Sequence, residues 1–162
     1  MSPRAAWRLE SLGFERVFDY VPGKADWAAS GLPTEGRLAN TPTVTKAVRR
    51  DVPTCRLEDR VGDIRERVRE AGWDRSVAVN EERVVLGVLR EKELSSDSEA
   101  TAEDVMRPGP TTVRPNEPAK KLAERMRKRG TLSVLVTTSD GRLEGLLYGK
   151  DAGRIAGVYN QP

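Results

Sequence analysis

Apolar and polar positions follow one another in the same order twice along the chain. The segments SVAVNEERVVLGVLR, from Ser76, and SVLVTTSDGRLEGLLYG, from Ser133, each contain an apolar run, a polar turn and a second apolar run. Such runs are typical of β-hairpins, and the Asp140-Gly141 pair is a strong turn signal. We therefore expect strands at 76–79, 84–89, 133–138 and 143–147.

An amphipathic helix is predicted before each hairpin, because apolar residues recur there at three- and four-residue spacing. The predicted buried faces comprise Val61, Ile64, Val68 and Ala71 in the first copy, and Ala119, Leu122, Ala123 and Met126 in the second. The predicted N-caps and closing glycines are Asp59 with Gly72, and Asn116 with Gly130. A further helix is expected after each hairpin, near Lys92 and Lys150.

The two copies are related by a nearly constant offset. Ile64 aligns with Leu122, and Gly87 with Gly145, at a spacing of 58 residues, whereas Ser76 and Ser133 are 57 apart. Each copy is a β-α-β-β-α unit of about sixty residues, which is too small to bury a sufficient core alone. The pair is expected to pack sheet to sheet as one α+β domain, with a short helix in AEDVMRP between the copies.

This tandem unit, the entry segment DVMRPGPTTVRPNEP and the core SVLVTTSDGRLEGLLYGKD resemble a pair of cystathionine-β-synthase (CBS) domains, over roughly residues 43–156. The resemblance implies two repeats with pseudo-twofold symmetry, which we place at 47–97 and 98–156, and two clefts between their sheets. It also implies a homodimer, because CBS pairs commonly associate two to a disc.

The CBS ligand motif follows the last strand of a repeat, and consists of a Gly, a hydrophobic residue, any residue, a Ser or Thr, two further residues and an Asp. The resemblance implies that the hydroxyl and a helix N-terminus meet phosphate, while the Asp accepts hydrogen bonds from ribose. The second copy keeps Gly145 and Asp151 but has Tyr148 at the hydroxyl position. The first copy has Arg90 there, and Glu93 in place of the Asp.

The cleft with Asp151 is therefore the first candidate to bind an adenine nucleotide or adenosyl ligand, such as AMP, ADP, ATP or S-adenosylmethionine. Its predicted residues are Thr112, Val113, Thr137, Gly145, Leu147, Tyr148 and Asp151. Those of the other cleft, where both motif positions differ from the family, are Gly87, Leu89, Arg90 and Glu93.

Alternatives remain open for these residues. Tyr148 could stack on a base and Arg90 could bind phosphate, or both could fill their clefts, and Asp151 could simply cap the last helix. Two functions therefore compete. One is a regulatory module that senses a ligand, and the other is a structural or dimerisation module whose clefts bind no nucleotide.

Residues 1–36 hold most of the aromatic residues and follow a different pattern. A helix with Ala6, Leu9 and Leu12 on one side is expected to end at Gly13, before a strand RVFDYV at 16–21 and a short helix through Trp27. Residues that resemble the C-terminal end of a rhodanese domain, a family of persulfide-carrying sulfurtransferases, are Ser2, Ala5, Ala6, Leu9, Gly13, Phe14, Val17, Tyr20, Gly23, Trp27, Gly31 and Pro33.

In the rhodanese family the catalytic cysteine lies in a loop just before this helix, and the sequence begins past that loop. We therefore expect residues 1–36 to be a remnant without sulfurtransferase activity, which either packs on the CBS pair through its aromatic residues or is loosely ordered. Residues 37–46 are predicted to be a linker and residues 157–162 a tail.

The composition excludes several kinds of site. The chain has no histidine and a single cysteine, which removes Ser-His-Asp and Cys-His pairs and most zinc sites. Neither a catalytic residue nor a metal ligand is expected, and Cys55 is predicted to be a small buried hydrophobe. The apolar runs are too short to cross a membrane and no signal-peptide core is visible, so a cytoplasmic location is expected.

The basic surplus lies in residues 101–162, with eleven basic and seven acidic side chains. Much of it falls in the helical segment AKKLAERMRKRG. This segment lacks the interleaved aromatic residues and motifs of nucleic-acid binding, so no nucleic-acid partner is expected. It is predicted to be a solvated face, which could also attract a phosphate-bearing ligand.

Overall fold

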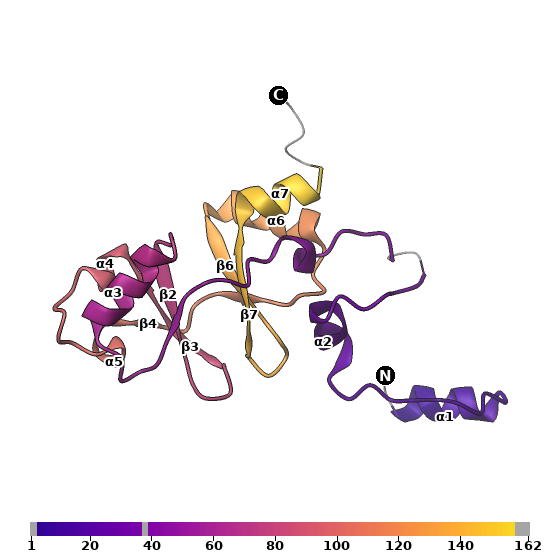
Figure 1. Cartoon of the computed structure of the whole chain (residues 1–162). Coiled ribbons are helices and arrows are strands. Elements are labelled where there is room, and N and C mark those ends of the chain that lie inside the picture. The colour runs from indigo at the N-terminus through magenta and orange to yellow at the C-terminus, as the bar shows by residue number, and fades with distance from the viewer. Residues whose placement is uncertain (1–2, 37–38, 158–162) are drawn as a thin grey trace.

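The computed structural model describes residues 3–36 and 39–157, and places two hairpins side by side, each in a small sheet of its own (Figure 1). The first sheet has the order β1-β2-β3-β4, with β1 parallel to β2 and the other pairs antiparallel. Its strands are β1 (Thr54–Cys55), β2 (Arg75–Val79), β3 (Val85–Arg90) and β4 (Arg107–Pro108).

The second sheet repeats this arrangement with three strands. Strand β5 is parallel to β6, and β6 is antiparallel to β7. Its strands are β5 (Thr112–Val113), β6 (Ser133–Thr137) and β7 (Leu143–Tyr148). The hairpins, the repeat and the α+β class are as the sequence predicts.

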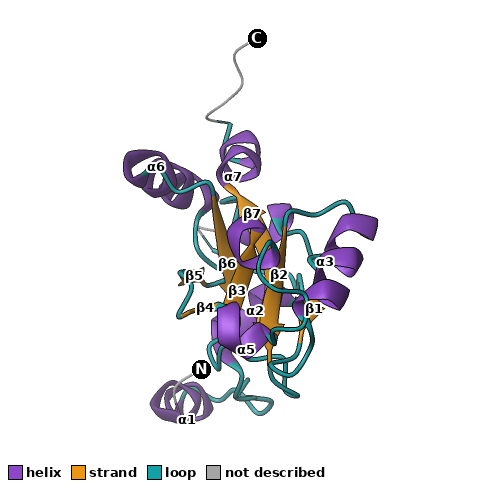
Figure 2. Cartoon of the chain, turned by 90° about the vertical axis from the view of Figure 1, so that its left-hand side faces the viewer, coloured by secondary structure: helices purple, strands orange, loops and turns teal. Residues whose placement is uncertain are grey.

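Helices cover the outer side of each sheet, with α3 and α6 on opposite sides of the strands (Figure 2). The helices of the two repeats are α3 (Val61–Glu70), α4 (Glu91–Leu94), α5 (Ala102–Val105), α6 (Ala119–Arg129) and α7 (Gly149–Ile155), and a 3-10 turn, η1 (Val44–Ala47), precedes them. The predicted faces of α3 and α6 are buried except for Ala71, which follows α3 and is exposed.

The predicted N-caps Asp59 and Asn116 are wrong. The capping positions are occupied by Arg60 and Pro118, and neither helix has a side-chain cap. Asp59 instead accepts hydrogen bonds from the Arg56 amide (3.2 Å) and the Arg67 guanidinium (2.5 Å). The helix ends are as predicted, since Gly72 and Gly130 adopt left-handed φ values of 69° and 62°.

The opening segment of each repeat packs on the other repeat. Val44 in η1 is fully buried in the core of the second repeat, and Ala102 in α5 is fully buried in the core of the first. The amide of Val44 donates to the carbonyl of Glu117 (3.0 Å), and the amide of Ala102 donates to the carbonyl of Asp59 (2.9 Å). These contacts repeat the 58-residue offset, so the two copies are related by pseudo-twofold symmetry and are held together by exchanged segments.

A third apolar cluster lies between the two sheets. It consists of Val52, Val77, Val79, Leu135, Leu143 and Leu146. Full burial of such a side chain stabilises a fold by about 1.5–3 kcal/mol. The hairpin tips are also joined, because the amide of Leu143 donates to the carbonyl of Arg83 at 2.9 Å. The repeats therefore share the apolar cluster between their sheets in addition to their own cores, which fits the small size of each unit.

The N-terminal segment lies apart from the sheets (Figure 1). It contains α1 (Pro3–Ser11), which has no buried residue, and α2 (Gly23–Ala29). The predicted strand 16–21 is wrong, because this stretch forms no β-pairing within the described residues, and a strand needs a neighbour for its backbone groups. A hydrogen bond that the Arg50 guanidinium donates to the carbonyl of Ala29 (2.7 Å) connects this segment to the repeats.

Aromatic side chains of this segment remain exposed. Trp7 and Phe18 are 66% and 74% exposed, and Tyr20 and Trp27 pack edge to face with ring centroids 5.2 Å apart. The segment predicted as a linker, 37–46, includes the buried Val44, and its residues 37–38 lie outside the described part, as do residues 158–162 of the predicted tail. No helix within 3–36 or 39–157 is long and apolar enough to cross a membrane.

A candidate ligand pocket between the repeats

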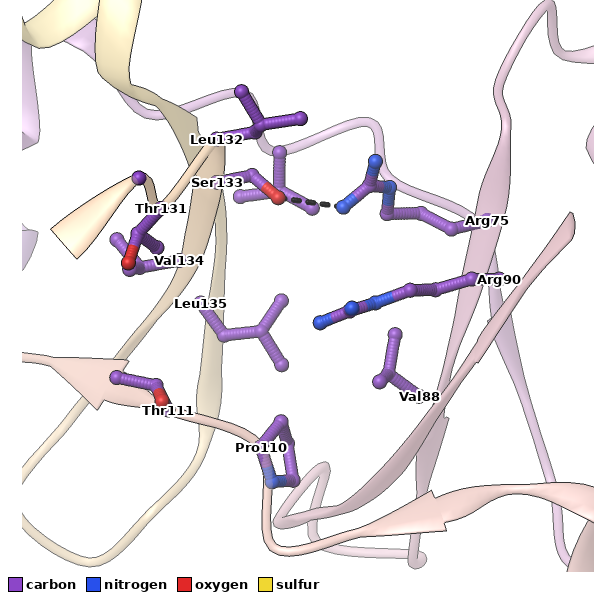
Figure 3. Close-up of a pocket in the computed structure, with 12 residues that line it drawn as sticks. Arg75, Val88, Arg90, Pro110, Thr111, Thr131, Leu132, Ser133, Val134 and Leu135 are labelled. Carbon is purple, nitrogen blue, oxygen red and sulfur yellow. Dashed lines mark hydrogen bonds between the residues drawn. The ribbon is translucent and has the colours of Figure 1, made fainter. Parts of the chain in front are cut away.

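A pocket of about 460 Å³ opens between the two repeats (Figure 3). This volume is within the range of small-molecule sites in proteins. The first repeat contributes Arg75, Val88 and Arg90, and the second contributes Pro110, Thr111, Gly130, Thr131, Leu132, Ser133, Val134, Leu135 and Leu146. The pocket thus combines an apolar surface with hydroxyl groups and two arginines.

The Arg90 side chain extends from the end of β3 across the pocket toward Leu135 of the other repeat (Figure 3). Within the described part of the chain, no hydrogen bond or ion pair holds its guanidinium. A guanidinium binds phosphate oxygens through two parallel hydrogen bonds. Arg90 is therefore available to an anionic ligand in this pocket.

Arg75, by contrast, is held in place next to Arg90 on the same wall, since the two residues pair between β2 and β3. Its guanidinium donates to both carboxylate oxygens of Asp74, at 2.7 and 2.6 Å, and to the Ser133 hydroxyl at 2.5 Å. The hydrogen bond with Asp74 raises the pKa of Arg75 and lowers that of Asp74. Arg75 is thus a fixed guanidinium, with its charge balanced by Asp74, beside the guanidinium of Arg90.

The symmetry-related cleft is filled by aromatic rings. Trp73 and Tyr148 stack with centroids 6.4 Å apart and an interplanar angle of 22°. The guanidinium of Arg49 lies 4.9 Å from the centroid of Tyr148, and the Tyr148 hydroxyl donates to Asp74 at 3.4 Å. Burial, more than the charge of Asp74, raises the pKa of Tyr148, so the phenol stays neutral at pH 7.

The repeat explains why one cleft is open and the other is filled. At the 58-residue offset, Trp73 corresponds to Thr131 and Tyr148 corresponds to Arg90. A threonine and an extended arginine cannot form the stacked aromatic pair, so the space that the rings occupy in one cleft is left as a pocket in the other.

Both motif carboxylates are buried and bound to arginines of the exchanged segments. Asp151 accepts two hydrogen bonds from Arg49 on one oxygen (3.1 and 2.8 Å) and one from Arg154 on the other (3.2 Å). Glu93 accepts from the side chain of Arg107 (2.6 Å) and from the backbone amide of Arg90 (3.1 Å). Burial would raise the pKa of Glu93, but these bonds outweigh it and lower the pKa.

The motif glycines make room for the same exchanged segments. A Cβ on Gly145 would lie 2.3 Å from the carbonyl oxygen of Arg49, and a Cβ on Gly87 would lie 2.5 Å from the sulfur of Met106 and 3.0 Å from the carbonyl oxygen of Arg107. In this structure both glycines therefore allow the close approach of an exchanged segment.

The other predicted site residues are dispersed. Leu89 and Leu147 are fully buried in the cores of their own repeats, and Val113 is in the core of the second. Thr112 is exposed on β5, next to the pocket residue Thr111. Thr137 pairs with Leu143 at the far end of the hairpin from Tyr148, and its hydroxyl accepts from Arg114. Of the predicted residues, the pocket contains Arg90 alone.

Sequence reasoning missed several residues at these sites, namely Arg49, Trp73, Arg75, Arg107, Thr111, Thr131 and Ser133. One signal was present for two of them, because Arg49 and Arg107 have the same 58-residue spacing as Glu93 and Asp151. Cys55 is buried, as predicted, and burial raises the pKa of its thiol. The described residues contain no group of three or more His, Cys, Asp or Glu side chains placed to hold a metal ion.

Solved structures with the same fold support this description. The CBS domains of a transcriptional regulator from Streptococcus pneumoniae are 24% identical, with a TM-score of 0.64 over 71% of this chain and 99% of that one. CBSX2 in complex with AMP is 20% identical, with a TM-score of 0.63 over 74% and 98%. The cytosolic domain of the Mg²⁺ channel MgtE in complex with ATP is 20% identical, with a TM-score of 0.64 over 73% of this chain and 51% of that one.

At the level of sequence, no curated protein matches the chain significantly. The family model of the CBS domain, however, matches twice, at residues 44–97 and 102–154, which is well over half of the chain. These matches coincide with the two repeats of the structure. The chain therefore belongs to the CBS domain family and contains a tandem pair of CBS domains.

Proposed function

We propose that this CBS pair is a non-catalytic regulatory module that binds an adenine nucleotide in the pocket between its repeats. The observation that carries the proposal is the Arg90 guanidinium, which has no partner among the described residues and extends into a pocket of about 460 Å³ beside the fixed guanidinium of Arg75. Phosphate would lie against Arg90, and the adenine ring against Val88, Leu135 and Leu146. Pockets with an apolar wall and a few oriented polar groups are typical of cofactor-sized ligands.

Relatives with the same fold support this class of ligand. CBSX2 was solved with AMP and the cytosolic domain of MgtE with ATP. Both ligands combine an adenine ring with phosphate, which matches the apolar and cationic halves of the pocket. The ligand would act by stabilising one arrangement of the two repeats, because the pocket contains residues of both.

Calorimetric titration with AMP, ADP, ATP and S-adenosylmethionine tests the proposal. We expect phosphate-bearing ligands to bind to the chain, and Arg90→Gln to weaken that binding by about 10-fold or more, because a hydrogen bond to a charged group contributes about 1.5–3 kcal/mol. The matched control is Arg69→Gln, which removes the same charge from a side chain that is 79% exposed on α3. Equal affinity of the Arg90→Gln variant and the control would refute the proposed site.

The cleft with Asp151 remains a second candidate for the nucleotide. Its carboxylate is bound to Arg49 and Arg154 and its aromatic rings are stacked, which favours a structural role for this side of the pair. An Asp151→Asn variant separates the two sites. Loss of nucleotide affinity in this variant, with the fold intact, would assign the ligand to the Asp151 cleft rather than to the Arg90 pocket.

The structural alternative is a dimerisation module that binds no nucleotide. We propose a homodimer under both functions, because CBS pairs commonly associate two to a disc. Sedimentation analysis across a range of protein concentrations tests this state, and a monomer at every concentration would refute it. A dimer without a response to any adenosyl ligand would favour the structural alternative.

We further propose that residues 1–36 are a rhodanese-like remnant without sulfurtransferase activity. The proposal is supported by α1 ending before Gly13 and α2 ending before Gly31, at matched positions of that family. Transfer of sulfur from thiosulfate to cyanide by the purified chain would refute it. The repeat boundaries at 47–97 and 98–156 and the cytoplasmic location likewise stay predictions.

A further inference from the structure

None of the described residues that line the pocket has an acidic side chain. Its twelve lining residues present two guanidinium groups and the hydroxyls of Thr111, Thr131 and Ser133, and the rest are apolar residues or glycine. The Ser133 hydroxyl already accepts a hydrogen bond from Arg75. The pocket's side chains therefore supply charged donors to a ligand that accepts hydrogen bonds, whereas a ligand group that donates them would meet only neutral hydroxyl acceptors.

The acidic residue that the motif places next to this pocket already accepts hydrogen bonds on both oxygens. Glu93 is only 6% exposed, and each of its carboxylate oxygens accepts a hydrogen bond within the protein, one from Arg107 and one from the Arg90 amide. A ribose diol that replaced Arg107 as the partner of Glu93 would leave the Arg107 guanidinium without its ion pair. Asp151, in the other cleft, is bonded on both oxygens in the same way.

We infer that the pocket recognises its ligand through a phosphate group and an apolar ring, and does not select for the ribose hydroxyls. This inference rests on the proposed function and specifies its ligand class: nucleoside monophosphates and related anions, whether ribo or deoxyribo. Arg49 and Arg107, which belong to the exchanged segments, bind the two motif carboxylates. The carboxylates are then not available to bind the ribose hydroxyls, and recognition depends on the charge of the ligand.

The expected difference in affinity between ribo and deoxyribo ligands follows from the side chains that line the pocket. A site built to hydrogen-bond a substrate hydroxyl rejects the analogue that lacks it by several orders of magnitude, because its buried polar groups are left unpaired. A pocket without a free carboxylate loses at most a contact to a neutral threonine hydroxyl. We therefore expect ribo and deoxyribo forms to differ by less than about threefold in affinity.

The test is a calorimetric comparison of AMP, 2′-deoxy-AMP, 2′,3′-dideoxy-AMP and adenosine on the whole chain. The inference requires the three monophosphates to bind within about threefold of one another and adenosine to bind at least 10-fold more weakly. AMP that binds 10-fold more tightly than 2′-deoxy-AMP would overturn it, as would adenosine that binds as tightly as AMP. If none of the four compounds binds, it is the proposed nucleotide function itself that fails, so the two failures are distinguishable.

Arg90→Gln provides a second readout. Because the inference assigns Arg90 to the phosphate, this variant should weaken AMP and 2′-deoxy-AMP by the same factor, and should leave adenosine unchanged. A variant that weakens AMP much more than 2′-deoxy-AMP would link Arg90 to the sugar and contradict the inference.

Discussion

The substitution Gly145→Ala should displace the opening segment of the first repeat, which packs on the second repeat. Gly145 has a φ of 149°, and a Cβ there would lie 2.3 Å from the carbonyl oxygen of Arg49 and 2.6 Å from a methyl carbon of Val48. These atoms can separate only if the exchanged segment around Val48 and Arg49 moves. That movement would break the two hydrogen bonds between the backbones of Arg49 and Leu146, both 2.9 Å long.

The magnitude combines two effects. Overpacking a tight site costs about 1–3 kcal/mol, and a backbone conformation that suits only glycine costs about 1–3 kcal/mol in any other residue. We therefore expect Gly145→Ala to lower the free energy of unfolding by about 2–6 kcal/mol. Gly87→Ala, at the equivalent position, should cost only about 1–2 kcal/mol, because the atom nearest to its Cβ belongs to the Met106 side chain, which can turn away.

Urea denaturation followed by circular dichroism measures both values. Gly109→Ala is the matched control, because Gly109 has a φ of 61° and a Cβ there would meet nothing within 4 Å, so the variant isolates the backbone effect at about 1–2 kcal/mol. If Gly145→Ala cost no more than Gly109→Ala, the exchanged segment would not pack tightly against β7 at Gly145, and the account of the exchanged segments would be wrong.

Three further predictions concern the contacts around the clefts and the N-terminal segment. Arg107→Met should lower the free energy of unfolding by about 1–3 kcal/mol at pH 7. Because the pKa of Glu93 is depressed in the folded chain, the difference from the parent chain should persist above the unfolded pKa of about 4.3 and disappear as the pH falls through the folded pKa. Urea titrations across that pH range measure it. Tyr148→Ala should cost about 1–3 kcal/mol, because it removes the stack on Trp73, while Tyr148→Phe should cost less than about 0.5 kcal/mol in the same assay. Deletion of residues 1–36 should change the melting temperature by less than about 4 °C, because α1 buries no side chain; a larger fall in a calorimetric scan would show that the segment is part of the fold.

Much of the fold could be predicted because its signals are local and occur twice. The hairpins, α3 and α6 follow from apolar periodicity, and Gly72 and Gly130 end their helices where the sequence indicates. The 58-residue offset then predicts that two incomplete units share a core. What failed was the strand at 16–21, where an apolar, β-branched and aromatic run has no neighbouring strand in the described structure to pair with.

The candidate site was less accessible to prediction, because its character depends on contacts between residues far apart in the sequence. Arg49 and Asp151 are 102 residues apart in the sequence. Their hydrogen bond forms only because the opening segment of one repeat packs on the other. Similarly, Trp73 and Tyr148 belong to different repeats, so nothing local indicates that they stack. Local motif comparison therefore emphasised Asp151, while the open pocket lies beside Arg90.

The most direct test of the central claim is a nuclear magnetic resonance titration of the isotope-labelled chain with AMP. The account predicts that the largest changes in backbone amide shifts occur around the pocket, at Val88, Thr111 and residues 131–135, and that Arg90→Gln removes them. Shifts concentrated instead at Trp73 and Asp151, or no shifts at any AMP concentration, would contradict it.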